Sequence, residues 1–385
     1  MTLNGGRVVI IGGGIIGISI AYHLGVAGYR NVAVVERNLL GEGTTAYATG
    51  GIRCQFSSRV NIELVQQSVD FWENFEAYTG RPLDFRKHGY LFLISDEITS
   101  VAFGKNAALQ RSLGVDVEIL DPAQIRTIFP GVRTDDLLSG TYTPNDGSAW
   151  PADAVAGYAH AARRNGVLVM QNTRVLDIVV GSEGTVSGVQ TSEGDIAAEV
   201  VVIAAGPQSR AVGALCGLDI PVFPHSRQAF AAGPVPSING NLPLTVDMAT
   251  GAYLHPLKTG GAIIGGNDRH VPSTEEARVD SGQAQGLAAA LWHRFPDLAE
   301  LKITAGWAGL REMTPDGLAI IGPAGEVGGL YIAAGFSGHG FMQSPAVGNS
   351  VAQLLLYGHP DLDLSPLSIT RFEAPLVGEV ENAVF

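Results

Sequence analysis

Residues 7–36 read RVVIIGGGIIGISIAYHLGVAGYRNVAVVE and decide the fold of the N-terminal part of the chain. Residues 7–11 are a short run rich in β-branched side chains, and residues 32–35 are a second apolar run. Between them, three glycines at 12–14 precede a segment, residues 15–27, with the apolar spacing of a helix. The stretch therefore predicts a strand, a tight turn, a helix and a parallel strand, which form one βαβ unit.

The glycines of this unit follow the pattern G-x-G-x-x-G, and an acidic residue ends the second strand 19 residues after the last of them. The first glycine permits the tight turn, the second lets a pyrophosphate approach the backbone, and the third allows close packing of helix on sheet. Free N–H groups at the helix start attract phosphate, and the acidic side chain accepts hydrogen bonds from ribose hydroxyls, which disfavours NADP. The residues expected to contact a dinucleotide are Gly12, Gly14, Ile15, Ile16, Gly17, Glu36 and Arg37.

Composition limits the classes of protein and the kinds of partner that remain possible. With 385 residues, of which 46% are hydrophobic and 16% charged, the chain is expected to fold into at least two domains. A formal net charge of -13 argues against nucleic acid as a partner. The two cysteines, Cys54 and Cys216, allow no disulfide framework or cysteine-rich metal site, so we expect a cytoplasmic protein without a metal. The apolar stretch 8–21 is too short for a membrane helix and has no cleavage site, so no membrane association is expected, whereas oligomerisation stays open.

The pattern changes several times along the chain. Uninterrupted apolar strands expected at 200–205 and 329–334 are typical of a buried parallel sheet, like the first strand. Residues 226–307 instead suggest antiparallel strands, including a hairpin of 253–257 with 262–266, and residues 41–56 suggest a loop. We therefore predict two interleaved domains. The dinucleotide-binding domain comprises residues 1–85, 145–225 and 320–385, and the substrate domain comprises residues 86–144 and 226–319.

Six blocks, in the same order, resemble the D-amino-acid oxidase-like family of FAD-dependent amine oxidoreductases, which includes glycine oxidase and sarcosine oxidase. The blocks are residues 8–36, 43–53, 146–166, 201–209, 307–323 and 332–348. The resemblance implies an α/β, Rossmann-like FAD domain of the glutathione-reductase type with a discontinuous α+β substrate domain built on an antiparallel sheet. It also implies noncovalent FAD, because Gly309 and Leu310 occupy the region where sarcosine oxidase has its flavin-linked cysteine.

The resemblance extends the set of cofactor contacts. Residues 43–51 match a loop that passes the pyrophosphate, although a Thr/Gly surface loop has the same composition. Residues 335–342 (GFSGHGFM) match a second flavin loop, in which the histidine is as readily a packing residue. Gln208 departs from the family, where many members have Trp. The further FAD contacts implied are Thr44, Thr45, Gly50, Gly51, Val175, Ala205, Gly206, Gly335, Gly338, His339, Gly340, Phe341 and Met342.

The substrate side depends on four residues. Arg311 resembles an arginine that binds the substrate carboxylate in glycine oxidase relatives, and its planar guanidinium suits a carboxylate; the alternative is an ordinary surface salt bridge. Tyr253 resembles an aromatic residue that borders the substrate, although a strand tyrosine is more often part of a core. Arg53 and His255 lie in blocks near the flavin by resemblance, and either is otherwise structural.

The resemblance implies oxidation of the C–N bond of an amino acid or N-substituted glycine. Hydride passes from the α-carbon to the flavin, the imine hydrolyses to an oxo acid and an amine, and O2 reoxidises the flavin with formation of H2O2. Three alternatives stay open: a dehydrogenase subunit that passes electrons to another acceptor, a NAD-dependent dehydrogenase, and a non-catalytic flavin-binding partner protein. The first is kept open by Ile263 and Ile264, which stand where sarcosine oxidase has an oxygen-activating lysine. The second leaves residues 335–342 unexplained.

Overall fold

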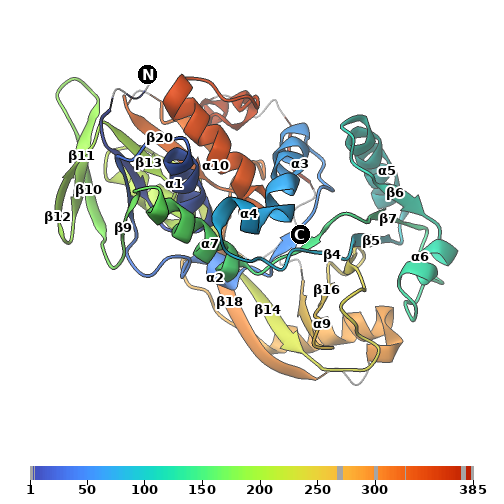
Figure 1. Cartoon of the computed structure of the whole chain (residues 1–385). Coiled ribbons are helices and arrows are strands. Elements are labelled where there is room, and N and C mark those ends of the chain that lie inside the picture. The colour runs from blue at the N-terminus through green and yellow to red at the C-terminus, as the bar shows by residue number, and fades with distance from the viewer. Residues whose placement is uncertain are drawn as a thin grey trace.

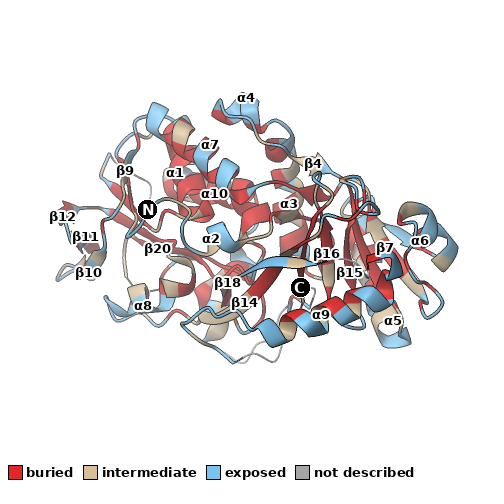
Figure 2. Cartoon of the chain, turned by 90° about the horizontal axis from the view of Figure 1, so that it is seen from below, coloured by how far each residue is buried: buried red, intermediate tan, exposed pale blue. Residues whose placement is uncertain are grey.

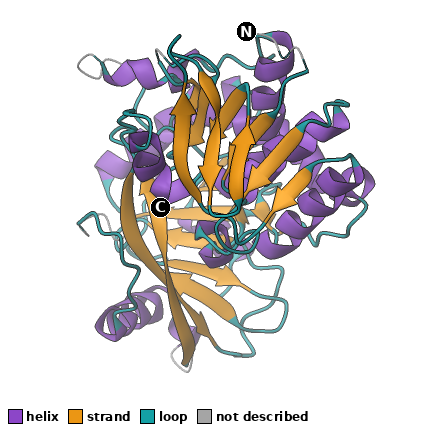
Figure 3. Ribbon diagram, turned by 90° about the vertical axis from the view of Figure 1, so that its left-hand side faces the viewer, coloured by secondary structure: helices purple, strands orange, loops and turns teal. Residues whose placement is uncertain are grey.

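Two large sheets organise the molecule. The computed structural model describes residues 3, 5–266, 272–298, 302–325, 327–373 and 379–382. A six-stranded sheet and an eight-stranded sheet form the centres of its two halves, which Figures 1 and 3 show from two sides. Within the described ranges, no helix combines the length and the apolar character needed to cross a lipid bilayer.

The six-stranded sheet contains the strands expected to run in parallel. Its order is β19 (Ile320–Pro323), β20 (Leu330–Ala334), β13 (Val200–Ile203), β1 (Val8–Ile11), β2 (Val32–Val35) and β9 (Leu168–Met170). All neighbours are parallel except β19, which is antiparallel to β20. The structure thus confirms that apolar strands from the start, middle and end of the chain form one parallel sheet.

The two faces of this sheet are covered differently, because successive strand residues point to opposite sides. Val8 and Ile10 of β1 join a core cluster with the helical layer, whereas Val9 and Ile11 join a cluster with a small antiparallel sheet. The small sheet consists of β10 (Val175–Val180), β11 (Val186–Thr191) and β12 (Gly194–Ala197). The helical layer contains α1 (Ile15–Val26), α3 (Arg59–Glu73), α4 (Phe75–Thr79), α7 (Pro151–Arg164) and α10 (Gly340–Tyr357). Figure 2 shows the buried residues of α1 and α10 at the centre of this layer.

The eight-stranded sheet is antiparallel except at one pair of strands. Its strands β5 and β15 pair in parallel, so the sheet is mixed rather than purely antiparallel. The two strands come from distant segments of the chain. A tight hairpin would make them antiparallel, but none joins them, so parallel pairing is possible. The order is β18 (Ile303–Met313), β14 (Phe223–Ala232), β17 (Ala262–Gly265), β16 (Tyr253–Pro256), β15 (Leu244–Asp247), β5 (Tyr90–Ile94), β7 (Ser139–Thr143) and β6 (Glu118–Leu120).

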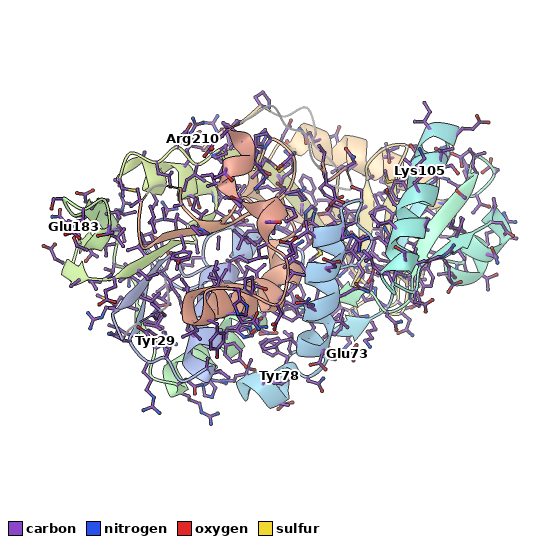
Figure 4. The ribbon with its side chains drawn as sticks, turned by 90° about the horizontal axis from the view of Figure 1, so that it is seen from above. Tyr29, Glu73, Tyr78, Lys105, Glu183 and Arg210 are labelled. Atoms are coloured by element: carbon purple, nitrogen blue, oxygen red, sulfur yellow. The ribbon has the colours of Figure 1, made fainter. Side chains whose placement is uncertain are left out.

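Helices and short elements complete the second half. The helices are α5 (Glu97–Ser112), α6 (Pro122–Ile128) and α9 (Ser281–Arg294), whereas α8 (Ser209–Ala214) follows β13 and packs against the core of the first half. Strands β3 (Gly51–Ile52), β8 (Gly147–Ser148) and β4 (Arg86–Lys87) form the last small sheet. Residues 41–56, expected as a loop, therefore contain β3 and also the short helix α2 (Thr44–Tyr47). Figure 4 shows the exposed Glu183, between β10 and β11, and Lys105, on α5, at opposite ends of the molecule.

Candidate active site

A cavity of about 470 Å³ is lined by residues of both large sheets. On one side the lining begins where the parallel strands end, at Ile11 of β1, Val35 of β2 and Ala204 after β13. On the other side it includes residues of β14, β15, β16 and β18. Ligands of open parallel sheets bind at the carboxyl ends of the strands, so this cavity is the candidate site.

The three glycines of the first turn are required for different reasons. Gly12 has φ +112°, and a Cβ there would lie 2.3 Å from the Ala204 carbonyl oxygen. A Cβ on Gly17 would lie 2.0 Å from the carbonyl oxygen of Gly12, so Gly17 permits close packing and does not itself line the cavity. At Gly14, which does line it, the nearest atom to a Cβ is Thr45 Oγ1 at 3.4 Å. Gly14 therefore keeps space open at the N-terminus of α1, where backbone N–H groups attract an anion.

Glu36 lies at one end of the cavity, together with Arg37 and Val175. Its carboxylate accepts hydrogen bonds from the backbone N–H groups of Gly13, at 2.7 Å, and Asn38, at 2.8 Å. These bonds fix the orientation of the side chain, and each carboxylate oxygen keeps a second lone pair for another donor. The arrangement fits a carboxylate that receives the hydroxyls of a ribose.

The loop before α10 contributes the start of that helix to the cavity. His339 is the N-cap residue of α10, and its ring meets the Phe56 ring edge to face, with 4.7 Å between centroids. Burial lowers the pKa of His339 well below its usual range, so the imidazole is neutral. Its Nε2 atom is buried and has no hydrogen-bond partner among the described residues. Gly338, Gly340, Phe341 and Met342 also line the cavity.

Arg311 lies at the other end, next to Tyr253. A Cβ on Gly338 would come within 2.6 Å of Arg311 Nε, so the glycine makes room for the guanidinium. Burial, with repulsion from Arg227 as a smaller contribution, lowers the pKa of Arg311 to about 10, which leaves it protonated at neutral pH. Arg311 forms no ion pair with any described residue, so the alternative of a surface salt bridge finds no support there.

Arg53 also lines the cavity, but aromatic rings and carboxylates surround it. Its guanidinium carbon lies 4.2 Å from the Phe56 ring centroid and 5.9 Å from that of Tyr90. Burial lowers the pKa of Arg53, while Tyr90, Glu381 and Asp146 raise it in smaller amounts. These rings and carboxylates therefore stabilise the positive charge of Arg53, which lies at the same end of the cavity as Arg311.

Three of the residues expected in the site lie outside the cavity lining: Gly17, described above, Gly335 and His255. At Gly335, with φ +74°, a Cβ would lie 2.4 Å from Thr314 Cγ2, so this glycine serves the turn. His255 stacks on His88 with 5.8 Å between ring centroids. Burial, then repulsion from His88, lowers the pKa of His255 to about 3. The ring thus faces a buried partner rather than the cavity.

The other expected residues do line the cavity: Gly12, Gly14, Ile15, Ile16, Glu36, Arg37, Thr44, Thr45, Gly50, Gly51, Arg53, Val175, Ala205, Gly206, Tyr253, Arg311, Gly338, His339, Gly340, Phe341 and Met342. Sequence analysis missed Arg227, Tyr90 and Glu312, which line it too. For Glu312 one signal was present, because Arg311 and Glu312 are the only charged residues in β18.

These residues fit FAD. The cavity has an acidic ribose end, a glycine opening at a helix N-terminus, and two buried polar atoms, Glu312 Oε2 and His339 Nε2, with no hydrogen-bond partner in the described ranges. Buried polar atoms are normally hydrogen-bonded, so both fit a polar ligand. The residues that would hold FAD run from Glu36 and Val175, through the turn at Gly14, to the start of α10.

Comparisons with known proteins agree with this fit. A family model for FAD dependent oxidoreductases matches residues 7–354. The chain is 32% identical over 372 residues to glycine oxidase from Geobacillus kaustophilus (strain HTA426), covering 94% of this chain and 96% of that protein. It is 30% identical over 372 residues to sarcosine oxidase subunit beta from Rhizobium meliloti (strain 1021), covering 95% and 88%.

A solved structure shows the same fold. L-proline dehydrogenase from P. horikoshii superposes with a TM-score of 0.90 at 31% identity, covering 95% of this chain and 97% of that chain. The expected fold class, cofactor and type of enzyme are thereby confirmed. With its dinucleotide turn, its cavity and these matches, the chain belongs to the family of FAD-dependent oxidoreductases that includes glycine oxidase.

Proposed function

We propose that this chain oxidises the Cα–N bond of a small amino acid or an N-substituted glycine. Arg311 carries the proposal, because a protonated guanidinium lines the cavity and forms no ion pair within the described residues. Relatives named for glycine, sarcosine and L-proline support a substrate that has a carboxylate next to an amine. The domain boundaries and site residues expected from the sequence are part of this proposal.

Arg311 binds and orients the substrate. Its planar fork donates two parallel N–H···O bonds to a carboxylate, which fixes both the position and the rotation of the α-carbon. Gly338 supports this role, since any side chain there would displace the guanidinium. Tyr253, on the neighbouring part of the cavity wall, limits the room for the substrate's remaining groups.

Charged residues of the cavity also influence the protonation of the substrate amine. The reaction needs an unprotonated nitrogen, and nearby cations disfavour an ammonium group. Arg227 lines the same cavity and acts in this direction, whereas nearby carboxylates offset the charge of Arg53 and His339 is neutral. FAD, when bound, supplies the acceptor for the hydride of the α-carbon. The substrate leaves as an imine, which water hydrolyses to an oxo acid and an amine.

The fate of the electrons is the open part of the proposal. In the oxidase form O2 takes them and gives H2O2; in the dehydrogenase form another acceptor takes them. Ile263 and Ile264 of β17 are both buried and place no lysine there, which keeps the dehydrogenase form as the second candidate.

An anaerobic spectrum tests the proposal. Purified protein under argon is mixed with glycine, sarcosine, L-proline or longer N-carboxymethyl amino acids, and loss of the visible flavin absorption identifies a substrate. Admitting air then separates the forms: an oxidase recovers its colour at once with one H2O2 per substrate, whereas a dehydrogenase stays bleached for minutes. Bound FAD that no amine bleaches would mean a non-catalytic flavin-binding protein.

The mode of FAD attachment is tested separately. We propose that FAD is noncovalent, because Gly309 and Leu310 of β18 offer no thiol to the flavin. Acid precipitation should therefore release all the yellow colour into the supernatant. A pellet that retains flavin would contradict this.

A further inference from the structure

Glu312 is a cavity residue that the proposed reaction does not use. It follows Arg311 in β18, and successive strand residues point to opposite sides. Arg311 lies against Gly338, whereas Glu312 lies against Gly206, where a Cβ would be 3.4 Å from Glu312 Oε2. The two neighbouring side chains therefore serve different parts of the cavity.

The carboxyl group of Glu312 has few partners of its own. The residue is 8% exposed, and Oε1 accepts one long hydrogen bond, 3.4 Å, from the backbone N–H of Phe336. Oε2 is buried with no hydrogen-bond partner among the described residues, which also provide no ion pair for this group. Burial raises the pKa of Glu312 to about 7. A buried carboxyl oxygen without a donor is costly, so Oε2 calls for a hydrogen-bond donor from a ligand.

The surroundings of Oε2 indicate which part of FAD that donor belongs to. Gly206 directly follows Ala204 and Ala205, and the Ala204 carbonyl oxygen lies 2.3 Å from where Gly12 would carry a Cβ. Glu312 thus lies on the phosphate-turn side of Arg311. Phosphate oxygens only accept hydrogen bonds and would repel a carboxylate, whereas the ribityl chain that joins phosphate to the flavin ring carries hydroxyl donors.

We propose that Glu312 Oε2 accepts a hydrogen bond from a ribityl hydroxyl of FAD and so anchors the cofactor between its phosphates and its ring. The inference rests on FAD in the cavity and not on the substrate proposed above. It makes Glu312 a cofactor-binding residue that helps to set how deeply the ring enters the substrate end.

Binding of FAD analogues to the apoprotein tests this, with quenching of flavin fluorescence as the readout. The ligands are FAD, analogues that each lack one ribityl hydroxyl, and N3-methyl FAD, which removes the ring's own N–H donor. At about pH 8, above the pKa of Glu312, wild-type protein should bind at least one deoxy analogue about 10- to 100-fold more weakly than FAD, the range expected for a hydrogen bond to a charged group. Glu312→Met should bind FAD more weakly by a similar factor and should no longer distinguish that analogue from FAD.

Two results would overturn the proposal. In the first, Glu312→Met loses as much affinity for every deoxy analogue, relative to FAD, as the wild-type protein does. In the second, the variant loses only the discrimination against N3-methyl FAD, which would assign the donor to the ring. Because no substrate is present in these titrations, failure here leaves the Arg311 proposal standing, and failure of Arg311 leaves this one standing.

Controls separate binding from folding. Methionine matches the length of glutamate without its oxygens, so the apoprotein of Glu312→Met should melt no lower than wild-type apoprotein. Glu312→Gln keeps an acceptor and should retain part of the affinity difference between FAD and the deoxy analogue. If Glu312→Met does not fold, this variant decides: an unchanged affinity difference overturns the proposal, and a reduced one supports it. Glu118→Gln, at an exposed position of β6 in the same sheet, should behave as wild type.

Discussion

The two ends of the cavity are built by different means. At the phosphate turn, Gly12, Gly14 and Gly17 work through the space that they leave for backbone and ligand. At the substrate end, Arg311 and Tyr253 work through side chains carried by two strands of the eight-stranded sheet. A backbone site requires particular residues at fixed spacing, whereas a side-chain site depends on how strands align. The first kind of site can be recognised in a single sequence, whereas the second can be recognised only when the pairing of the strands is known.

The largest expected effect is at the phosphate turn. Gly14→Val should abolish FAD binding, because its side chain would occupy the space that the pyrophosphate needs. The fold should survive, since the backbone of Gly14 has φ -72° and a Cβ meets nothing closer than 3.4 Å. The measurements are the FAD content and the circular dichroism of the purified variant. A folded variant with stoichiometric FAD would remove the assignment of this turn.

Gly17→Ala is the matched contrast. Its Cβ would lie 2.0 Å from a backbone oxygen, which cannot move without shifting the turn. This variant should lose thermal stability even as apoprotein, whereas Gly14→Val should not. Equal melting temperatures for the two apoproteins would contradict the distinction between a ligand-facing and a packing glycine.

At the substrate end, Arg311→Ala should lower kcat/KM by about 30-fold to several thousand-fold. The reason is the loss of a charge-assisted interaction of about 2–5 kcal/mol, at roughly tenfold for each 1.4 kcal/mol. FAD content should stay at the wild-type level, and Arg311→Lys should recover only part of the activity, because it lacks the planar fork.

A substrate methyl ester is the control for Arg311. It should be a poor substrate for the wild-type protein and little affected by Arg311→Ala, since it offers no carboxylate. If Arg311→Ala turns over carboxylate substrates normally, a neutral amine becomes the better assignment.

The same contrast explains what the sequence could predict. The strand at residues 8–11 was predictable because it is an unbroken apolar run, as expected of a strand buried on both faces, and the helix after it because a long apolar segment directly follows the glycine turn. The parallel pairing of β5 with β15 was not, because no local pattern connects two separate segments. Likewise, the place of Glu312 in the cavity lining depends on the direction of β18, and the place of His255 outside it depends on stacking with His88, and neither is visible in a local pattern.

The smallest expected effect concerns His255, which lies outside the cavity lining. Burial lowers the pKa of His255 to about 3 and that of His88 to about 4, with Arg86 adding repulsion to both. Both imidazoles are neutral in the folded protein. In the unfolded chain they take up protons below the ordinary histidine pKa of about 6.5. The free energy of unfolding is therefore highest above pH 6.5 and falls with pH, down to about pH 4 through His88 and about pH 3 through His255.

His255→Gln should therefore leave kcat/KM little changed. The slope of unfolding free energy against pH between 6.5 and 4 should become smaller by about 1.4 kcal/mol per pH unit, which corresponds to one proton. Denaturant titrations at several pH values provide the slope. An unchanged slope together with a large loss of activity would contradict this account and support a catalytic role for His255.

Rapid mixing under argon tests the central claim, which joins the two ends of the cavity in one reaction. FAD-loaded wild-type protein and FAD-loaded Arg311→Ala are each mixed with the best carboxylate substrate and with its methyl ester, while flavin absorption is followed. Wild-type protein should bleach quickly with the carboxylate and slowly with the ester, and Arg311→Ala should bleach slowly with both. Wild-type protein that keeps its absorption with every amine, or Arg311→Ala that bleaches as fast as wild type, would contradict the account.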